Sequence, residues 1–287
     1  MNVYKGKAYA KINLTLEITG VENNYHLLDS LVASVDVFDE IKVTKRADDY
    51  STITMQGMGS ETIPSEINNA LKAAFAFSKK CKCNGVDIEI KKHIPLGGGL
   101  GGSSTDASAV LVAMSKLYEV EDKAVVEEIA DSLGSDTRYM LTGGYQRMQG
   151  RGNILSETGI DQVLHLLLLC PDSSVSAGAC YKKYDELPKT LEWRENATEA
   201  CIKALLEGNI HEATKHVTND LYVPALHLND DVLTAYDEMC ALQPLTAGMT
   251  GSGSCVFGVF ETAKDCACAK KKYQGNFRVI ATRTVKP

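Results

Sequence analysis

The sequence predicts an α+β protein of two domains, and three observations lead to this expectation. Its 287 residues are enough for two ordinary domains, each with its own apolar core. The first part opens with alternating, strand-like segments and then changes to helical spacings. The second part mixes strands and helices, which is typical of sheets covered by helices on one face. We expect the domains to be residues 1–152 and 153–287.

Composition narrows the class of protein. Hydrophobic residues make up 44% and charged residues 23% of the chain, as in folded globular proteins. The net charge of −7 argues against a nucleic-acid partner, because such a surface needs a basic footprint. No apolar run approaches the roughly 20 residues of a membrane span, and the N-terminal residues lack a signal peptide's apolar segment. We therefore expect a cytoplasmic protein without nucleic-acid or membrane partners, as a monomer or a weak homodimer.

The first elements follow from apolar periodicity. Residues 8–18, "AYAKINLTLEI", alternate between apolar and polar side chains, which predicts a half-buried strand with a solvated polar face. Residues 31–45 and 51–57 are rich in branched side chains and continue an antiparallel sheet. Residues 65–82 then have helical spacing, and "GVDIEI" at 85–90 is strand-like.

A glycine-rich stretch leads into the best-defined helix. In "KKHIPLGGGLGGSSTDASAVLVAM" (91–114), five glycines fall within six residues before a serine pair. The apolar spacing that follows predicts a helix beginning near Ser103 or Ser104, with Ser103 and Asp106 at capping-box spacing.

The remaining elements follow in order. A helix at 121–134 ends on Gly134, which we expect to form a left-handed cap. A glycine-broken hairpin at 142–153 marks the expected domain boundary. Beyond it we expect strands at 163–170, 255–260 and 277–285, and helices near 195–207, 210–218 and 229–241.

Three familiar nucleotide loops do not fit the glycine stretch. A Walker A loop needs a lysine where this chain has Ser103. Gly97, Gly99 and Gly102 satisfy G-x-G-x-x-G, but six residues separate the preceding strand from Gly97 and another helix follows, unlike a dinucleotide fold. The sequence also lacks the H-R-D and D-F-G motifs of protein kinases.

The stretch still fits a polyphosphate site. Glycines let the backbone approach an anion, and a helix N-terminus directs N–H groups and a positive dipole end at it. Ser103 and Ser104 add hydroxyl groups, and residues 91–93 add positive charge. The alternative interpretation is a flexible connector.

Spacing disfavours one metal motif and rules out another. Cys81 with Cys83, and Cys266 with Cys268, have one residue between the thiols, fewer than structural zinc pairs usually have. "HEATKH" (211–216) places its histidines five residues apart, off one helical face. We expect reduced, mostly buried cysteines.

"PLGGGLGGSSTDA" (95–107) resembles the central motif of the GHMP family of small-molecule kinases. "AKINLTLEITG", the Tyr25–His26 pair, "LGSD" (133–136) and "TGSGSCVF" (250–257) are similar, in the same order, to the branch acting on a cytidine diphosphate-linked methylerythritol. That branch uses ATP to phosphorylate the 2-hydroxyl of 4-diphosphocytidyl-2-C-methyl-D-erythritol in non-mevalonate isoprenoid (terpenoid) biosynthesis. The resemblance implies ATP and Mg²⁺ as cofactors. It also implies an N-terminal ATP-binding domain similar to ribosomal protein S5 domain 2, a ferredoxin-like C-terminal domain, and an active site between them.

The resemblance assigns the catalytic pair. Lys11, which would otherwise be a solvated strand lysine, matches the residue that holds the substrate hydroxyl and stabilises its charge. Asp136, which would otherwise be a helix N-cap, matches the base that takes the hydroxyl proton.

The resemblance also assigns the binding residues. Those implied for ATP are Asn68, Lys92, Pro95, Gly97, Gly98, Gly99, Leu100, Gly101, Gly102, Ser103 and Ser104, with Ser104 as the metal ligand. Those implied for the acceptor are Asn13, Tyr25, His26, Tyr181, Gly251, Ser252 and Gly253. Tyr25 and Tyr181 would sandwich the cytosine and His26 would recognise its polar edge, although exposed aromatics after a turn often have no function. Asn68 has the alternative role of a helix cap.

Five positions depart from the family pattern: Ser103, Thr137, Arg138, Asn153 and Ala177. We expect Arg138, beside the implied base, to reshape the acceptor pocket. The open alternatives are another GHMP kinase acting on a different alcohol and a catalytically idle nucleotide-binding relative; a dinucleotide oxidoreductase is less favoured.

Overall fold

The structure is a computed structural model that describes residues 1–60, 68–188 and 196–287. The chain forms two compact units, each gathered from several parts of the sequence. The first unit contains residues 1–10, 37–96 and 101–143, and the second contains 11–36, 97–100 and 144–287. The expected single boundary after residue 152 is therefore replaced by a discontinuous division. The reason is that two long strands, β1 (Val3–Asn13) and β3 (Tyr25–Lys45), each contribute to both units.

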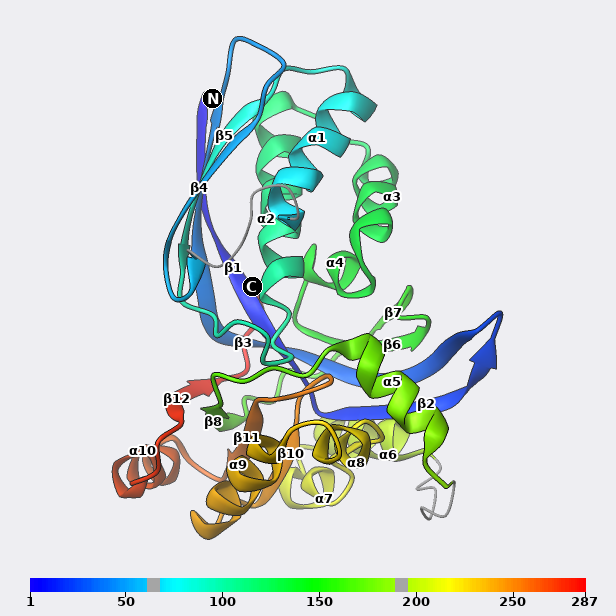
Figure 1. The fold of residues 1–287 in the computed structure, drawn as a ribbon, viewed down its shortest axis with the longest axis vertical. Helices are drawn as coiled ribbons and strands as arrows, with labels where there is room; N and C mark the ends of the chain where they lie inside the picture. The colour runs from blue at the N-terminus through cyan, green and yellow to red at the C-terminus, as the bar shows by residue number, and fades with distance from the viewer. Residues whose placement is uncertain (61–67, 189–195) are drawn as a thin grey trace. The chain divides into compact units, whose positions relative to one another are not determined.

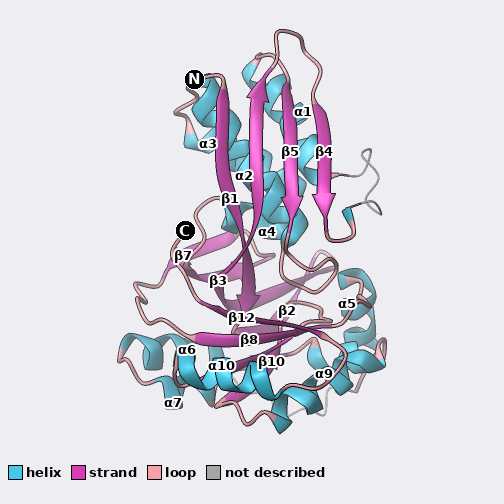
Figure 2. Ribbon diagram, turned by 90° about the vertical axis from the view of Figure 1, so that its left-hand side faces the viewer, coloured by secondary structure: helices cyan, strands magenta, loops and turns pink. Residues whose placement is uncertain are grey.

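The first unit is a sheet with helices on one face (Figures 1 and 2). β4 (Thr52–Gly57) pairs in parallel with β5 (Val86–Lys92), β5 pairs antiparallel with the second half of β3, and β1 also pairs with β3. The helices are α1 (Asn69–Cys81), α2 (Gly102–Tyr118), α3 (Lys123–Leu133) and α4 (Ser135–Met140). Their apolar sides meet the sheet in a core that includes Val43, Phe77, Ile88 and Leu111, which supplies the burial that holds this layer together.

The second unit contains two groups of strands. In the first group, β2 (Thr15–Glu22) and β6 (Tyr145–Gly150) both pair antiparallel with the first half of β3. β7 (Ile154–Glu157) completes a hairpin with β6, and β9 (Thr218–Asn219) pairs in parallel with β2. The second group is an antiparallel sheet in the order β10 (Thr246–Met249), β11 (Val256–Phe260), β8 (His165–Cys170) and β12 (Arg278–Arg283).

Within the described residues, six helices belong to the second unit. α9 (Asp230–Ala241) and α10 (Ala263–Lys272) pack on the antiparallel sheet, where Leu167, Met239 and Phe260 share a core. α5 (Ala177–Glu186) and α8 (Tyr222–Leu226) pack together, and α6 (Ala197–Leu206) packs with α7 (Ile210–Thr214). Within the described residues, no helix is both long and apolar enough to cross a bilayer.

The mixture of strands and helices agrees with the expected α+β class, but local details differ. The strand expected at 8–18 is divided at Leu14, and its polar side chains are buried rather than solvated. Gly134 follows α3 with φ 158° and ψ 156°, which is extended backbone rather than a left-handed cap. Helices α5 and α10 were not expected, and the helix expected at 210–218 ends at Thr214. Residues 65–67 of the helix expected at 65–82 lie outside the described residues.

Candidate active site

Lys11 lies in a buried polar row that runs along β1 and into β2. Lys11 and Asn13 are each 4% exposed, and Thr15 is fully buried. Lys11 Nζ donates a 2.6 Å hydrogen bond to Asn13 Oδ1, and Asn13 Nδ2 donates to Ser30 Oγ at 2.9 Å. Burying an ammonium is costly unless polar groups receive its protons. The implied catalytic lysine is therefore held in a polar interior, and the solvated-lysine alternative is wrong.

The loop after β10 is tied directly to Asn13. The N–H of Gly251 donates to Asn13 Oδ1 at 3.1 Å, and the N–H of Asn13 donates to Thr250 Oγ1 at 3.1 Å. Asn219 Nδ2 holds the same loop from β9 by donating to the carbonyls of Met249 and Gly251, both at 2.8 Å. Two implied acceptor-binding positions, Asn13 and Gly251, thus meet in one polar cluster.

The other two implied residues of this loop have contacts within the protein. Ser252 Oγ donates to the carbonyl of Val175 at 3.1 Å. Gly253 has φ +85°, and a Cβ placed on it would lie 2.8 Å from Met249 Sδ. The turn therefore requires glycine at this position for steric and conformational reasons.

The first part of the glycine stretch packs against this loop. A Cβ placed on Gly98 would lie 2.3 Å from Cys255 Sγ, and one placed on Gly99 would lie 2.1 Å from the carbonyl oxygen of Thr250. The carbonyl of Leu100 accepts a 3.0 Å hydrogen bond from the N–H of Lys11. These glycines are required for close approach to the protein's own backbone as well as for any approach to an anion.

Helix α2 begins at Gly102, one residue before the expected range. The preceding residue, Gly101, has φ 74°, and no side chain caps the helix. The expected capping box is wrong because Asp106 accepts instead from Lys92 Nζ at 2.5 Å. Ser103 is exposed and Ser104 is half-buried, and neither hydroxyl has a hydrogen-bond partner within the described residues. The first turn of α2 thus combines uncapped N–H groups with two available hydroxyls.

We expected Lys92 to add positive charge beside the glycine stretch, but its ammonium is buried and paired with carboxyl groups. Its side chain is 1% exposed and lies between the carboxylates of Asp39 and Asp106. Pro95, also implied for ATP, is buried in the turn that follows. The alternation of Val86, Ile88, Ile90 and Lys92 places all four on one face of β5, and this pattern is the signal that the sequence reasoning missed.

Asn68 is the N-cap of α1. Its Oδ1 accepts from the N–H groups of Ala70 at 2.8 Å and Leu71 at 3.3 Å, and its Nδ2 donates to Met55 Sδ at 3.2 Å. Because Oδ1 already satisfies helix N–H groups, the geometry favours the cap over a nucleotide contact.

Asp136 lies in the first turn of α4 and is half-buried. The N-cap of α4 is Gly134, so the alternative role of Asp136 as an N-cap is wrong. The next residue, Thr137, is buried, and its carbonyl accepts a 2.5 Å hydrogen bond from Ser108 Oγ of α2. Helix α2 therefore supports the turn that carries Asp136.

The departures from the family pattern have local explanations. Arg138 donates to Asp131 at 2.7 Å and to Glu127 at 2.8 Å, both on α3, so its guanidinium is held by α3. Asn153 Oδ1 accepts from the N–H of Arg151 in the β6–β7 turn. Ala177 is the first residue of α5. The expectation that Arg138 reshapes an acceptor pocket is not supported by these contacts.

The implied cytidine residues form an aromatic cluster between β3 and α5. The His26 ring stacks on Tyr181 with centroids 4.8 Å apart, and Tyr184 meets it edge-on at 5.9 Å. His26 Nε2 also lies 2.8 Å from Asp185 Oδ1. Tyr25 is 58% exposed. The partner of Tyr181 is therefore His26, whereas the sequence reasoning placed Tyr181 opposite Tyr25.

Tyr25 has a cationic neighbour. The guanidinium carbon of Arg151, in the β6–β7 turn, lies 4.3 Å from the centre of the Tyr25 ring. Such a contact is a cation–π interaction and leaves the other face of an exposed ring available. The sequence reasoning did not single out Arg151, because its relation to Tyr25 depends on the pairing of β6 with β3.

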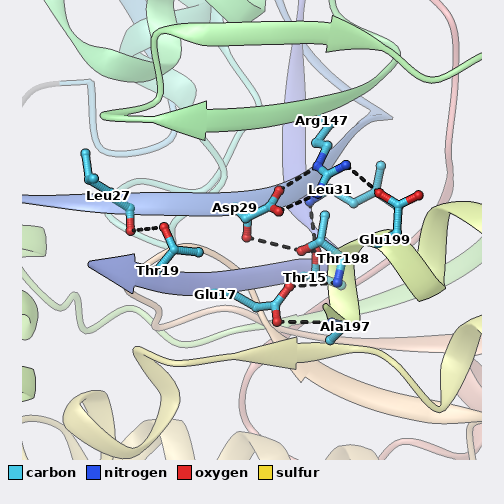
Figure 3. A network of polar contacts seen from close by, with 10 residues as sticks. All are labelled: Thr15, Glu17, Thr19, Leu27, Asp29, Leu31, Arg147, Ala197, Thr198 and Glu199. Atoms are coloured by element: carbon cyan, nitrogen blue, oxygen red, sulfur yellow. Dashed lines mark hydrogen bonds and ion pairs between the residues drawn. The ribbon is translucent and has the colours of Figure 1, made fainter. Parts of the chain in front are cut away.

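A polar network not predicted from the sequence anchors the strand next to this cluster (Figure 3). Arg147 of β6 makes a two-pronged contact with Asp29 of β3 at 2.8 and 2.7 Å and reaches Glu199 of α6 at 2.5 Å. Its hydrogen bond to Asp29 raises the pKa of the Arg147 guanidinium further above its ordinary value. Arginine and carboxylate match geometrically in such pairs, so the contact fixes β6 on β3.

The same network joins α6 to β2. Both carboxylate oxygens of Glu17 accept backbone N–H groups at the start of α6, from Ala197 at 3.0 Å and Thr198 at 2.7 Å (Figure 3). A carboxylate at a helix N-terminus is favoured by the helix dipole. Thr15 Oγ1 lies 2.7 Å from Thr198 Oγ1. The buried polar row that begins with Lys11 is thus continued by Thr15 and Glu17, which are hydrogen-bonded to the start of α6.

The described residues show neither a disulfide-bonded cysteine nor a group of three or more His, Cys, Asp or Glu side chains suited to a metal ion. The nine cysteines are free thiols, and five of them are buried. Burial raises the pKa of the Cys180 thiol to about 11, which keeps it protonated at neutral pH.

Comparison with known proteins places these features in a family. A family profile described as "GHMP kinases N terminal domain" matches residues 68–146. The 4-diphosphocytidyl-2-C-methyl-D-erythritol kinase of Syntrophomonas wolfei is 31% identical over 278 residues, covering 96% of this chain and 95% of the relative. That of Caldicellulosiruptor bescii is 35% identical over 260 residues, covering 89% of each.

Comparison with solved structures agrees with the comparison of sequences. A 4-(cytidine 5'-diphospho)-2C-methyl-D-erythritol kinase matches with a TM-score of 0.78 and 27% identity, covering 98% of this chain and 99% of that one. A homoserine kinase from Cytophaga hutchinsonii has a TM-score of 0.75 and 16% identity, covering 100% of this chain and 95% of that one, and shows the shared fold. Identity above 30% over almost the whole length shows that this chain belongs to the 4-diphosphocytidyl-2-C-methyl-D-erythritol kinase family of GHMP kinases.

Proposed function

We propose that this chain transfers the γ-phosphoryl group of ATP to the 2-hydroxyl of 4-diphosphocytidyl-2-C-methyl-D-erythritol. The observation that carries the proposal is the buried Lys11–Asn13 pair, joined by hydrogen bonds to Gly251 and, through its backbone, to Leu100. The near-complete similarity to kinases named for this acceptor supports the choice of alcohol.

The donor side is the N-terminus of α2. Its uncapped N–H groups and the hydroxyls of Ser103 and Ser104 suit the phosphates of ATP, because a helix N-terminus attracts anions. Magnesium, when bound, neutralises charge on those phosphates. The hydroxyl of Ser104 fits one magnesium ligand, since magnesium usually takes few protein ligands and completes its shell with phosphate oxygens and water.

The acceptor side uses Asp136 and Lys11. In this proposal Asp136 takes the proton of the attacking hydroxyl as its oxygen bonds to the γ-phosphorus and the bond to ADP breaks. The Lys11 ammonium stabilises negative charge on the reacting oxygens, and Asn13 holds that ammonium in place. Phosphoryl transfer depends mainly on positioning and charge stabilisation, so this pair is sufficient for the step.

The cytidine side uses the cluster around His26. The exposed ring of Tyr25 offers a face on which cytosine stacks, and the His26 ring, supported by Tyr181, offers its polar edge. Base stacking on an aromatic ring contributes about 1–3 kcal/mol. Arg151, already over Tyr25, adds positive charge suited to the diphosphate of the acceptor.

ADP release measured with a panel of alcohols tests this proposal. We expect turnover with the cytidylyl acceptor and none with mevalonate, homoserine or sugars. Asp136→Asn should lower kcat by about 100-fold or more, because general bases contribute on this scale. Asp131→Asn is the matched control, since Asp131 pairs with Arg138 on an exposed surface and should leave kcat unchanged.

Turnover only with another alcohol would refute the acceptor and indicate a different GHMP kinase. ATP binding without any turnover would indicate an idle relative. Full activity in Asp136→Asn would refute the assigned base.

A further inference from the structure

Three charged side chains occupy core-facing positions in the first unit. Asp39 lies on the buried face of β3, Lys92 on the buried face of β5, and Asp106 on the buried side of α2. Asp39 is fully buried, Lys92 is 2% exposed and Asp106 is 5% exposed. Charged side chains are almost never buried so completely unless they are paired, so their arrangement needs an explanation.

These residues connect three elements of the unit. Lys92 Nζ lies 2.5 Å from Asp39 Oδ2 and 2.5 Å from Asp106 Oδ2. The other oxygen of Asp39 accepts the N–H groups of His93 at 2.5 Å and Ile94 at 2.9 Å. The cluster therefore joins β3, the end of β5 with the turn after it, and α2.

The ammonium lies beneath the residue at which α2 begins. A Cβ placed on Gly102 would lie 3.7 Å from Lys92 Nζ and 3.3 Å from Ile94 Cγ2. A cation at this end of a helix is opposed by the helix dipole. The two carboxylates offset that repulsion, and they hold the ammonium under Gly102.

The pKa shifts of Lys92 and Asp106 agree with this pairing. Burial lowers the pKa of Lys92, but attraction to Asp106 and Asp39 outweighs it, so the pKa is raised and the lysine stays charged. Burial, opposed by Lys92 and assisted by Asp39, raises the pKa of Asp106 to about 8. Asp106 Oδ1 has no hydrogen-bond partner within the described residues, so Lys92 is the contact that holds this carboxyl.

We infer that Lys92, Asp39 and Asp106 form a positioning cluster that sets the first turn of α2 for phosphate binding, and that Lys92 does not touch the nucleotide. This inference rests on the proposed function, because it takes the N-terminus of α2 as the phosphate site. Loss of any member lets the first turn of α2 move, so the N–H groups and the Ser103 and Ser104 hydroxyls lose their alignment. The inference concerns the donor side alone, so binding of the acceptor is not expected to change.

A double-mutant cycle tests the inference. Lys92→Met, Asp106→Asn and the double variant are compared for Mg·ADP affinity by calorimetry and for both KM values and kcat by ADP release. We expect each single variant to bind Mg·ADP about tenfold more weakly, as supporting partners of ligand-binding groups do. The double variant should bind no more weakly than the worse single variant, since both remove one link. KM for the acceptor should stay within about twofold.

A direct nucleotide contact by Lys92 gives a different pattern. It predicts weaker binding in Lys92→Met but unchanged or tighter binding in Asp106→Asn, which leaves the ammonium in place, and this result would overturn the inference. A merely structural role lowers the melting temperature without changing the affinity of the folded protein, which would also overturn it. If Lys92→Met does not fold, Lys92→Arg and Asp106→Asn provide the comparison, with Arg restoring affinity toward wild type.

Lys42→Met is the matched control, because Lys42 pairs with Glu89 on the exposed face of the same two strands. We expect no change in Mg·ADP affinity for this variant. Wild-type protein that does not bind Mg·ADP would contradict the proposed function itself. If the wild type binds Mg·ADP but the variants do not show the expected loss of affinity, only the inference about the cluster is contradicted.

Discussion

Two lysines are buried among the described residues, one in each unit, and they differ in their surroundings. Lys92 continues an apolar row of β5, and its ammonium lies 2.5 Å from each of two carboxylates. Lys11 lies in a polar row, donates to the amide of Asn13, and is linked through Asn13 to the Gly251 turn. Burial alone therefore does not identify a catalytic lysine. In our proposal, the chemical nature of the row and the loops bonded to it separate the positioning role of Lys92 from the catalytic role of Lys11.

Replacing each lysine by methionine tests this difference between Lys11 and Lys92 most directly. If Lys11 acts as proposed, Lys11→Met should lower kcat by about 100- to 1000-fold, because the variant loses the ammonium that stabilises charge on the reacting oxygens. Lys92→Met should instead cost about 3–5 kcal/mol in the free energy of unfolding, because it leaves the buried Asp39 and Asp106 side chains without the cation that pairs with both. Urea unfolding and ADP release measure the two effects. Equal loss of kcat at saturating substrates in both variants would contradict the distinction.

A pair of glycine variants tests the packing around the Lys11 site. Gly99 and Gly208 have φ of +76° and +71°, but a Cβ on Gly99 meets the Thr250 carbonyl at 2.1 Å, whereas Gly208 has nothing within 4 Å. Gly208→Ala should cost about 1–2 kcal/mol from the left-handed backbone alone. Gly99→Ala should lower the free energy of unfolding by more than this. It should also raise KM for the acceptor, since the loop that holds Asn13 must shift. Equal unfolding free energies for the two variants would show that the close approach of Gly99 to the Thr250 carbonyl is unimportant for stability.

We also expect a pH dependence of stability from the Lys92 cluster. The pKa of Asp106 is about 8 in the folded protein and its ordinary value is 3.8, so between these pH values the folded state binds more protons. The stability from this group is full below 3.8 and is lost as the pH rises toward 8, by at most about 1.4 kcal/mol per unit. Melting temperatures from pH 5 to 9 should fall less in Asp106→Asn than in wild type. Parallel curves would contradict the role of Asp106.

Sequence reasoning worked where a signal is local. Strands at 165–170 and 256–260 and the helix at 230–241 follow their apolar periods and lie within a few residues of the expected bounds. It was less successful at α5, whose single buried residue, Cys180, leaves almost no apolar stripe to detect. It also mistook Asp106 for a capping residue, because the spacing from Ser103 cannot show that Lys92 lies nearby.

By itself, the sequence determined the mixture of strands and helices and the glycines before α2, and its resemblance to the GHMP kinases implied the roles of Lys11 and Asp136. Only the tertiary structure decided which charged groups meet. It buried the polar row that begins with Lys11, and it placed Lys92 between two aspartates. The physical reason is the sequence distance between interacting residues, because periodicity reports only contacts between near neighbours in the chain. The partners of a buried charge come from wherever folding brings a compensating group, as Asp39 is brought to Lys92 from 53 residues away.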